Sequence, residues 1–301
     1  MSDPGKRAGF VALVGAPNAG KSTLLNALIG EKIAIVTHKI QTTRNRISGI
    51  SVKDQTQIIF VDTPGIFKSP KRRLERAMVD AAWKGVSGTD MTALLVDARA
   101  GINPQVRHII TGLKEQGVRA VLVLNKVDKT PRTSLLELSR ELNTLGAFEE
   151  TFMISALKGD GVEDLHTYLA AKMSKGPWLY PEDQISDVSL RFLASEITRE
   201  QIFLNLHQEL PYALAVETAA WEERKDGSVR IEQNILCARE NHKAMVIGKK
   251  GTMLKKIGET ARHEMAAVFG RKVHLFLHAK VAQDWYEKPG HYREIGLDFK
   301  V

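Results

Sequence analysis

The sequence has only one cysteine, Cys237, so no disulfide can form within the chain. Such cysteine usage is typical of the reducing cytoplasm, and we interpret Cys237 as a small buried apolar residue rather than a reactive thiol. No apolar run approaches the roughly 20 residues that span a bilayer, and the first residues lack the apolar segment of a secretion signal. These absences favour a globular cytoplasmic protein over a secreted or membrane-spanning one.

Patterns of metal ligands and of repeats are missing as well. The C-terminal region has no cysteine cluster, and its histidines follow no metal-ligand spacing. We interpret most of these histidines as surface or strand-face residues: His242, His263, His274 and His278. No internal repeat or low-complexity tract interrupts the chain. The sequence therefore gives little support to an RNA-modifying metalloenzyme or to a repeat protein.

The composition is that of a globular protein with an excess of positive charge. Its 301 residues favour two domains, and 43% hydrophobic with 26% charged residues suffices for sizeable cores. The formal net charge of +8 suggests a polyanionic partner. The charge is clustered, because residues 239–280 hold ten Lys or Arg against three Asp or Glu, and residues 39–76 hold nine against three.

Residues 8–175 alternate short β-branched runs with helical patterns. This alternation predicts an α/β domain whose mixed, mostly parallel six-stranded sheet is covered by helices. Residues 46–61, RISGISVKDQTQIIFV, differ because two strand-like runs flank a short polar turn, which predicts a hairpin and hence one antiparallel strand.

Two prolines and a glycine within residues 174–187 interrupt this pattern and mark a boundary. Beyond it, a long amphipathic helix pattern, two strand-like runs around a KDG turn, two helical patterns and a last strand follow one another. The element order α-β-β-α-α-β predicts a separate α+β domain. The predicted parts are a first domain at 1–175, a linker at 176–187 and a second domain with a C-terminal tail at 188–301.

A glycine-rich loop, GAPNAGKST, lies between the first predicted strand and the first predicted helix. It matches G-x-x-x-x-G-K-[ST], whose glycines let backbone N–H groups turn towards phosphates at a helix N-terminus. Lys21 is expected to reach the outer phosphates and the Ser22 hydroxyl to bind magnesium. A chance glycine turn is the alternative, and the strand–loop–helix context disfavours it. The nucleotide-binding candidates here are Gly15, Ala16, Pro17, Asn18, Ala19, Gly20, Lys21, Ser22 and Thr23.

Three further stretches, DTPG, NKVD and SAL, come where later strands end. The carboxylate of DTPG is placed to hold magnesium, and its glycine offers an unhindered N–H to the last phosphate. The aspartate of NKVD can accept from the N1–H and 2-amino groups of guanine, a donor pair that adenine lacks, so GTP is favoured over ATP. SAL is expected to supply a backbone N–H to the guanine oxygen. These candidates are Asp62, Thr63, Pro64, Gly65, Asn125, Lys126, Asp128, Ser155, Ala156 and Leu157.

Together the four stretches resemble the GTP-binding domain that Ras-like and translation-factor GTPases share. The resemblance implies a P-loop GTPase fold, GTP or GDP with Mg²⁺ as ligands, and a threonine that closes on the metal. Thr42 and Thr43 are both candidates, and we favour Thr43 because it lies next to the following strand. The implied roles are then catalytic for Lys21, Thr43 and Gly65, and metal-binding for Ser22, Thr43 and Asp62.

One position departs from that family pattern. Many such GTPases carry glutamine directly after the DxxG glycine, where it orients the attacking water, whereas this chain has Ile66. An isoleucine side chain cannot hydrogen-bond water, so we expect slow hydrolysis without an activator. We further expect residues 36–46 and 62–76 to rearrange with the nucleotide.

A second glycine loop, VIGKKG, lies between two helical patterns of the second domain. It lacks the Lys-Ser of a P-loop and no strand leads into it, so a second nucleotide site is disfavoured. The element order around GxxG resembles a type II KH domain, whose loop clamps about four single-stranded nucleotides. A solvated glycine-lysine turn is the alternative. The RNA-binding candidates are Val246, Ile247, Gly248, Lys249, Lys250, Gly251, Lys255 and Lys256.

The order GAPNAGKST, QTTR, DTPGI, NKVD, SAL and VIGKKG in one chain closely resembles the Era family of bacterial GTPases. The resemblance implies a monomeric protein that acts in small ribosomal subunit assembly and 16S rRNA maturation. It implies binding to single-stranded RNA at the 3′ end of 16S rRNA, and a cytoplasmic location with part of the protein peripheral on the inner membrane. The alternative is a membrane-associated GTPase switch in cell-cycle control that binds protein partners.

Overall fold

The protein is described from a computed structural model in which the chain forms two compact units. The first unit comprises Met1–Ala34, Thr43–Asp187 and Tyr292–Val301, and the second comprises Ile35–Thr42 and Val188–His291. The described residues are 5–37, 39, 42–44, 46–68, 70, 73–206, 213–283, 285, 292 and 297–300. The segments at 36–46 and 62–76 that we expect to rearrange lie partly outside these residues.

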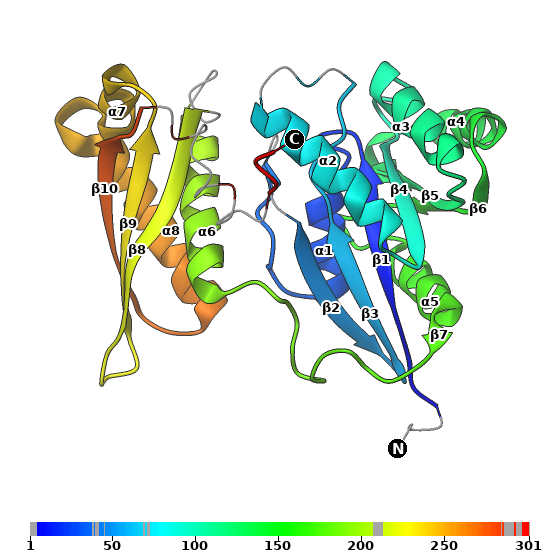
Figure 1. Cartoon of the computed structure of the whole chain (residues 1–301), viewed down its shortest axis with the longest axis horizontal. Coiled ribbons are helices and arrows are strands. Elements are labelled where there is room, and N and C mark those ends of the chain that lie inside the picture. Colours follow the sequence, from blue (N-terminus) through cyan, green and yellow to red (C-terminus); the bar gives the residue numbers. More distant parts are fainter. Residues whose placement is uncertain are drawn as a thin grey trace. The chain divides into compact units, whose positions relative to one another are not determined.

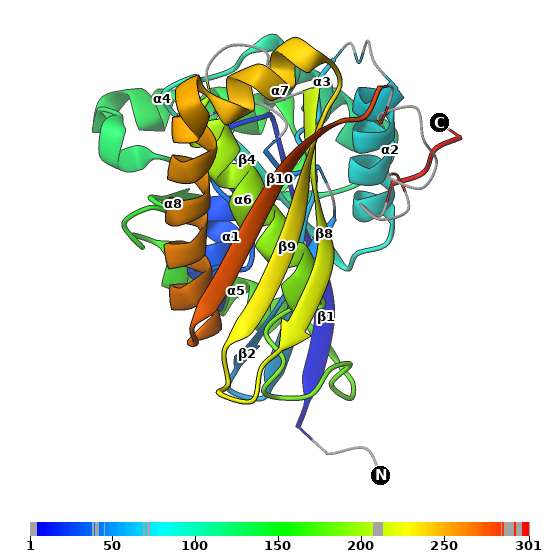
Figure 2. The same cartoon turned by 90° about the vertical axis from the view of Figure 1, so that its left-hand side faces the viewer.

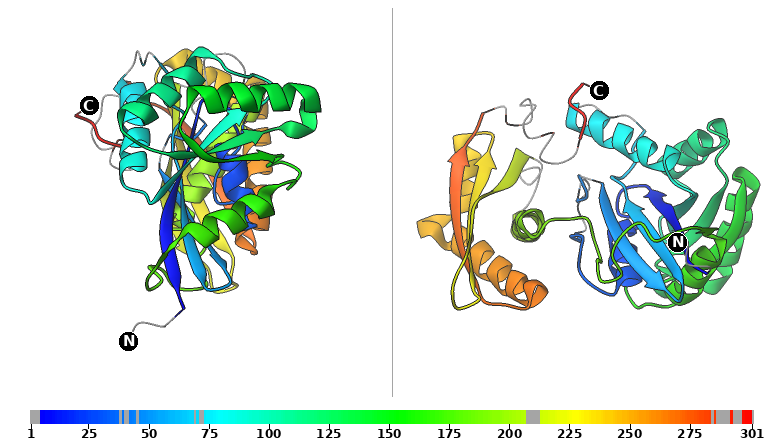
Figure 3. Two further views of the ribbon diagram at one scale, coloured as in Figure 1. Left: turned by 90° about the vertical axis from the view of Figure 1, so that its right-hand side faces the viewer. Right: turned by 60° about the horizontal axis from the view of Figure 1, so that its bottom comes forward.

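A mixed sheet forms the centre of the first unit, with the strand order β2-β3-β1-β4-β5-β6. β2 runs antiparallel to β3 as the hairpin pattern predicts, and the other neighbours in this order are parallel. A short strand that the sequence did not predict, β7 (Ser174–Lys175), pairs antiparallel with β1. The main strands, blue to green in Figures 1 and 3, are β1 (Arg7–Gly15), β2 (Ile47–Lys53), β3 (Thr56–Asp62), β4 (Met91–Asp97), β5 (Ala120–Asn125) and β6 (Phe148–Ile154).

Helices cover both faces of this sheet because its strands are apolar on both sides. On one face, apolar side chains of α2, α3 and α4 pack against alternate residues of β1, β4 and β5, among them Val14, Leu94 and Leu124. α1 and α5 lie on the other face (Figure 1). The helices are α1 (Lys21–Ile29), α2 (Arg73–Ser87), α3 (Pro104–Glu115), α4 (Arg132–Leu145) and α5 (Val162–Lys172).

The carboxyl ends of the parallel strands meet at one edge of the sheet. β1 ends at Gly15, β3 at Asp62, β4 at Asp97 and β5 at Asn125. Three of these four residues belong to the motifs predicted to bind nucleotide. The topology alone therefore brings motifs that are far apart in the sequence to a common edge.

The segment at 176–187, predicted as the linker, is hydrogen-bonded to the β2–β3 hairpin. The side chain of Gln57 accepts from the N–H groups of Leu179 and Tyr180 at 2.8 and 3.0 Å, and donates to the carbonyl of Tyr180. Further along, the N–H of Ile50 donates to the carbonyl of Ile185 at 2.8 Å. The segment is thus attached to the first unit, which extends to Asp187.

The second unit has the predicted order α-β-β-α-α-β. Its three-stranded sheet has the order β10-β9-β8, with β9 parallel to β10 and antiparallel to β8. α6 and α8 cover one face of this sheet (Figure 2). The elements are α6 (Leu190–Asn205), β8 (Leu214–Glu223), β9 (Val229–Cys237), α7 (Glu240–Ile247), the 3-10 turn η3 (Lys249–Gly251), α8 (Thr252–Phe269) and β10 (Val273–Val281).

Cys237 lies in the core of the second unit, in agreement with its interpretation from the sequence as a small buried apolar residue. It ends β9 and is fully buried beside Leu214 and Val246. Burial raises the pKa of its thiol to about 11. The thiol is therefore protonated at neutral pH, and Cys237 fits a packing role better than a reactive one. No described helix is long and apolar enough to cross a membrane.

Candidate nucleotide site and nucleic-acid interface

The glycine loop between β1 and α1 is fixed by close packing against neighbouring strand ends. A Cβ atom on Gly15 would lie 2.5 Å from the carbonyl oxygen of Leu95. A Cβ on Gly20 would lie 2.2 Å from Nδ2 of Asn125, and Gly20 also has a φ of 100°, which disfavours other residues. α1 then begins at Lys21 without a side-chain cap, so its first N–H groups can receive an anion.

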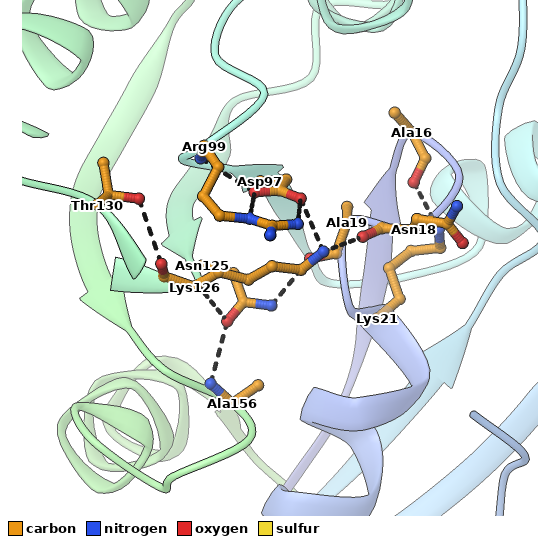
Figure 4. Close-up of polar contacts among 10 residues, drawn as sticks. All are labelled: Ala16, Asn18, Ala19, Lys21, Asp97, Arg99, Asn125, Lys126, Thr130 and Ala156. Carbon is orange, nitrogen blue, oxygen red and sulfur yellow. Dashed lines mark hydrogen bonds and ion pairs between the residues drawn. The ribbon is translucent and has the colours of Figure 1, made fainter. Parts of the chain in front are cut away.

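Lys21 folds back over the loop (Figure 4). Its side chain is buried, and its Nζ donates to the carbonyl oxygens of Gly15 and Ala16 at 3.2 and 3.3 Å. Burial lowers the pKa of Lys21, and the charge of Asp62 opposes this effect. A phosphate in the loop would add negative charge next to the ammonium and favour its charged form.

Three oxygen-bearing side chains from three motifs meet beside the loop. The Ser22 hydroxyl lies 2.7 Å from Oδ2 of Asp62 and 2.7 Å from the Thr43 hydroxyl, and Thr43 donates to the same Oδ2 at 3.3 Å. Burial raises the pKa of Asp62, although the charge of Lys21 and the hydrogen bonds from Ser22 and Thr43 oppose this. Among the described residues, the buried Oδ1 of Asp62 has no hydrogen-bond partner. Hard oxygen donors with one orphaned carboxylate oxygen fit Mg²⁺.

Thr42 points elsewhere. Its hydroxyl contacts the hydroxyl of Thr37 at 2.6 Å and donates to the carbonyl of Lys39 at 2.6 Å. Of the two threonines left as candidates by the sequence, the structure therefore brings Thr43 to Ser22 and Asp62.

Asn125 ties three of the predicted motifs together (Figure 4). Its Nδ2 donates to the carbonyl of Ala19 in the glycine loop at 2.8 Å. Its Oδ1 accepts from the N–H of Lys126 at 2.8 Å and from the N–H of Ala156 at 3.0 Å. Because Asn125 is buried, loss of these bonds would leave polar groups unsatisfied in three loops at once.

Asp128, the carboxylate predicted to recognise guanine, is in contact with Ser155 and Lys158. Oδ1 of Asp128 accepts from the Ser155 hydroxyl at 2.9 Å, and the Lys158 ammonium lies 4.0 Å from Oδ2. Leu157, the last residue of SAL, is exposed. The motifs NKVD and SAL are thus in direct contact, and Asp128 retains lone pairs for further donors.

Asp97 lies beside these residues, although none of the predicted motifs contains it. Lys126 extends across the site, and its Nζ contacts the carbonyl of Asn18 at 2.6 Å and Oδ2 of Asp97 at 2.7 Å (Figure 4). Burial alone would raise the pKa of Asp97, but hydrogen bonds from Lys126 and Arg99 hold it below its usual value. The signal was available, since β4 lies between β1 and β5 and also ends in a polar residue.

Ile66 is part of the core. Its side chain is fully buried in the cluster that contains Val14 and Leu94, and its N–H donates to the carbonyl of Gly15 at 3.3 Å. The side chain therefore packs in the core behind the glycine loop and is not exposed to a ligand in that loop.

We expect Ile66→Ala to lower the free energy of unfolding by about 2–4 kcal/mol through cavity formation. Urea denaturation measures this loss. Single-turnover GTP hydrolysis, measured well below the melting temperature, is expected to change less than about threefold, since the change removes only packing. A loss of turnover as severe as that of Lys21→Ala would contradict a purely structural role for Ile66.

The second glycine loop is shaped by backbone conformations that side chains resist. Gly248 has a φ of 72°, and a Cβ there would lie 2.7 Å from the Cβ of Met253. Gly251 has a φ of 78°, and Lys250 between them has a φ of 53°. The side chains of Lys249 and Lys250 are exposed. The loop thus offers two cations and a close backbone approach, as a phosphodiester clamp requires.

The other positively charged side chains of the second unit differ in how strongly they are already paired. Lys255 and Lys256 are exposed on the first turns of α8, close in sequence to the loop. Arg271, in contrast, donates to both carboxylate oxygens of Glu223 and lies over the ring of Trp221. Lys255 has only an exposed, longer contact of 3.8 Å with Glu259, so the lysines of the loop and of α8 are better placed to bind an anion than Arg271.

Models of two families match the chain. Residues 10–126 match a family described as 50S ribosome-binding GTPase, and residues 209–286 match the KH domain. The chain is 54% identical to the GTPase Era of Brucella suis biovar 1 (strain 1330) over 97% of this chain and 94% of that protein. It is 55% identical to the GTPase Era of Sinorhizobium medicae (strain WSM419) with the same coverage.

Two solved structures match nearly the whole chain. A variant of Era from Aquifex aeolicus bound to GDP·AlF4⁻ has a TM-score of 0.91 and 38% identity, covering 96% of this chain and 99% of that one. Era in complex with MgGDPNP and nucleotides 1506–1542 of 16S ribosomal RNA has a TM-score of 0.91 and 37% identity, covering 97% and 99%. The two-domain architecture is therefore shared as well as each fold.

Proposed function

The chain belongs to the Era family of GTPases, and on that premise we propose that it hydrolyses GTP and binds single-stranded 16S rRNA during assembly of the small ribosomal subunit. The observation that carries the proposal is that one chain has a P-loop beside which the oxygens of Ser22, Thr43 and Asp62 meet, and also a GxxG loop with exposed lysines. A close structural relative was solved with both kinds of ligand, MgGDPNP and a fragment of 16S rRNA.

In the nucleotide site, the protein is proposed to position the phosphates and to neutralise their negative charge. The N–H groups of the loop that begins at Gly15 surround the phosphates, and Lys21 offsets their negative charge. Ser22, Thr43 and Asp62 would hold Mg²⁺, which supplies electrostatic stabilisation of the developing negative charge. The N–H of Gly65 would donate to the last phosphate. A Cβ on Gly65 would lie 2.9 Å from Cγ of Pro17, so this backbone can approach the loop only as glycine.

The base is proposed to lie against NKVD and SAL. Asp128 would accept from the two adjacent donors of guanine, while the Lys126 stem packs on its face. The hydrogen bond from Ser155 and the network around Asn125 support this role, since they preorganise the acceptor. Because Ile66 is buried, the attacking water must be oriented by a group other than the side chain that follows DTPG.

In the second unit, the loop from Gly248 to Gly251 is proposed to clamp the RNA backbone, with Lys249 and Lys250 on the phosphates. Val246 and Ile247 support the loop, and Lys255 and Lys256 extend the positive surface. The strained backbone of the loop and the exposure of its lysines support this proposal.

From the proposed function we expect the bound nucleotide to change the affinity for RNA. An RNA with the sequence of nucleotides 1506–1542 of 16S rRNA is expected to bind at least about fivefold more tightly with a non-hydrolysable GTP analogue than with GDP, a typical coupling between two sites. Fluorescence anisotropy at constant Mg²⁺ measures both affinities. Equal affinities would remove the coupling, and absence of binding at low ionic strength would remove the RNA-binding function itself.

We also propose that the protein is a monomer of the cytoplasm that contacts the inner membrane peripherally. Its positive net charge supports attraction to anionic lipid. Flotation with vesicles that contain anionic phospholipid, against neutral vesicles, tests the contact, and light scattering tests the monomer.

A further inference from the structure

Asp97 ends β4, the strand that lies between β1, which leads into the glycine loop, and β5, which leads into NKVD. It is paired in register with Asn125 at the end of β5. Its side chain is only 13% exposed. Because carboxylates are rarely buried without a partner, the contacts of Asp97 indicate what its charge does.

The carboxylate of Asp97 is oriented by its own turn. Its Oδ1 accepts from the N–H of Arg99 at 3.0 Å, and its backbone carbonyl accepts from the N–H groups of Ala100 and Gly101 at 3.0 and 3.1 Å. Aspartates commonly fix turns by bonding the backbone two residues on. The guanidinium of Arg99 adds contacts at 3.3 and 3.4 Å, but this side chain is half exposed. With Oδ1 held by the turn, Oδ2 faces Lys126.

Lys126, the lysine of NKVD, is held at both ends. Its backbone has a φ of 67°, a left-handed conformation that is uncommon for lysine. Its Nζ lies 2.7 Å from Oδ2 of Asp97 and 2.6 Å from the carbonyl oxygen of Asn18 (Figure 4). A Cβ on Gly20 would lie 4.0 Å from Cε of Lys126, so the lysine stem runs along the glycine loop.

A lysine side chain has four rotatable bonds, and it loses much rotamer freedom when a ligand orders it. The contacts that order Lys126 are made by protein groups alone, so they form without a nucleotide. We propose that Asp97 is a positioning residue for nucleotide binding, because it fixes the Lys126 ammonium so that the stem is already extended where guanine is to pack. Such preorganisation raises affinity by lowering the entropy lost on binding. The proposal rests on the role of Lys126 given under the proposed function.

A purely stabilising ion pair is the alternative, and the chemistry of the pair disfavours it. Desolvation offsets much of the attraction between buried charges, so such a pair is weak evidence for stability. Burial alone would raise the pKa of Asp97, yet hydrogen bonds from Lys126 and Arg99 hold it below its usual value, so the carboxylate is charged at neutral pH. A charged acceptor binds an ammonium more strongly than the carbonyl of Asn18 can. The specific result of this charge is the fixed direction of Lys126.

The test compares variants that differ in whether the Lys126 ammonium keeps its anchor. Asp97→Asn retains the shape of the side chain and an acceptor for the N–H of Arg99, but it removes the charge. Lys126→Met retains an apolar stem and removes the ammonium. Arg99→Ala removes the other side-chain partner of Asp97. Asp80→Asn is the matched control, since Asp80 also pairs with a lysine, Lys84 at 2.8 Å, but on α2.

We expect Asp97→Asn to weaken GDP and GTP binding equally, by about fivefold, through faster dissociation. Stopped-flow release of a fluorescent GDP measures the dissociation rate. Single-turnover hydrolysis at saturation is expected to change less than about twofold, because the reacting phosphates are untouched. Lys126→Met is expected to weaken binding at least as much, and Asp97→Asn added to Lys126→Met to change it by less than about twofold further. Arg99→Ala and Asp80→Asn are expected to bind GDP like the wild type.

Three results would overturn the proposal. The first is an additive loss of affinity in the double variant, which would show that Asp97 does not act through Lys126. The second is an equal loss in Arg99→Ala, and the third is a parallel loss of affinity, saturated rate and melting temperature in Asp97→Asn, which would indicate general damage. Lys126→Met separates the two levels. If it binds GDP normally, the role of Lys126 in the proposed function fails, whereas if it binds weakly and Asp97→Asn binds normally, the positioning role alone fails.

Discussion

Asp128→Asn is expected to lower the affinity for GTP and GDP at least about 100-fold and to create affinity for xanthine nucleotides. The carboxylate is proposed to accept from two neighbouring donors of guanine, and an asparagine would place an NH₂ group against one of them. A buried donor left facing a donor forfeits the hydrogen bond and its desolvation energy, which supports discrimination of this size. Xanthine carries a carbonyl oxygen where guanine has its amino group, so it can accept from asparagine.

The structure makes this a clean substitution. Asparagine has the same shape as aspartate, and its Oδ1 can still accept from the Ser155 hydroxyl. Competition of GDP and XDP with a fluorescent guanine nucleotide measures both affinities. Asp160→Asn is the control, since it removes one negative charge from the exposed loop after SAL. Unchanged GDP affinity in Asp128→Asn, or an equal loss in Asp160→Asn, would place the base elsewhere.

Replacement of Lys249 and Lys250 together by aspartate is expected to weaken single-stranded RNA binding at least about 100-fold. Both side chains are exposed, so the fold loses no packing. The double variant would exchange two proposed phosphate contacts for two repulsions, and the slope of log affinity against log salt concentration is expected to fall by about 1–2. GDP affinity is expected to remain that of the wild type.

The charge-matched control replaces Lys114 and Arg119, which are exposed at the end of α3 and just after it, by aspartate. This control changes the net charge equally but leaves the GxxG loop intact. If it weakened RNA binding as much as the loop variant, attraction would come from overall charge and not from a clamp. Retained affinity and an unchanged salt slope in the loop variant would likewise contradict the assigned interface.

The sequence was sufficient for the fold because its signals are local. Strand–helix alternation, the polar turn at Asp54 and the KDG turn each specify short-range geometry, and the topology then follows from known packing rules. The loop glycines were predictable from the motif alone, and the structure explains them, because atoms of Leu95 and Asn125 leave no room for a Cβ on Gly15 and Gly20 once the sheet has formed. The motif therefore identified these glycines, and the packing of the folded loop explains why glycine is needed there.

Contacts across long sequence distances were not predictable. Asp97 has no motif of its own; the polar end of its strand indicates a place at the edge of the sheet, but its partner becomes visible only when Lys126 reaches it from the neighbouring strand end. The buried charges of α6 look like an ordinary polar stripe in the sequence, because the segment that covers them lies more than 150 residues upstream. The attachment of residues 176–187 to the hairpin was missed for the same reason, since Gln57 gives no local sign of its partners.

Because residues 176–187 are attached to the β2–β3 hairpin, the free part of the chain before α6 is very short. Asp187 is still bonded to Ser48 of β2, and Ser189 already caps α6, so Val188 alone separates the two anchored ends. The backbone dihedrals around Val188 are therefore where this segment can act as a hinge, since the residues on either side of Val188 are held by hydrogen bonds.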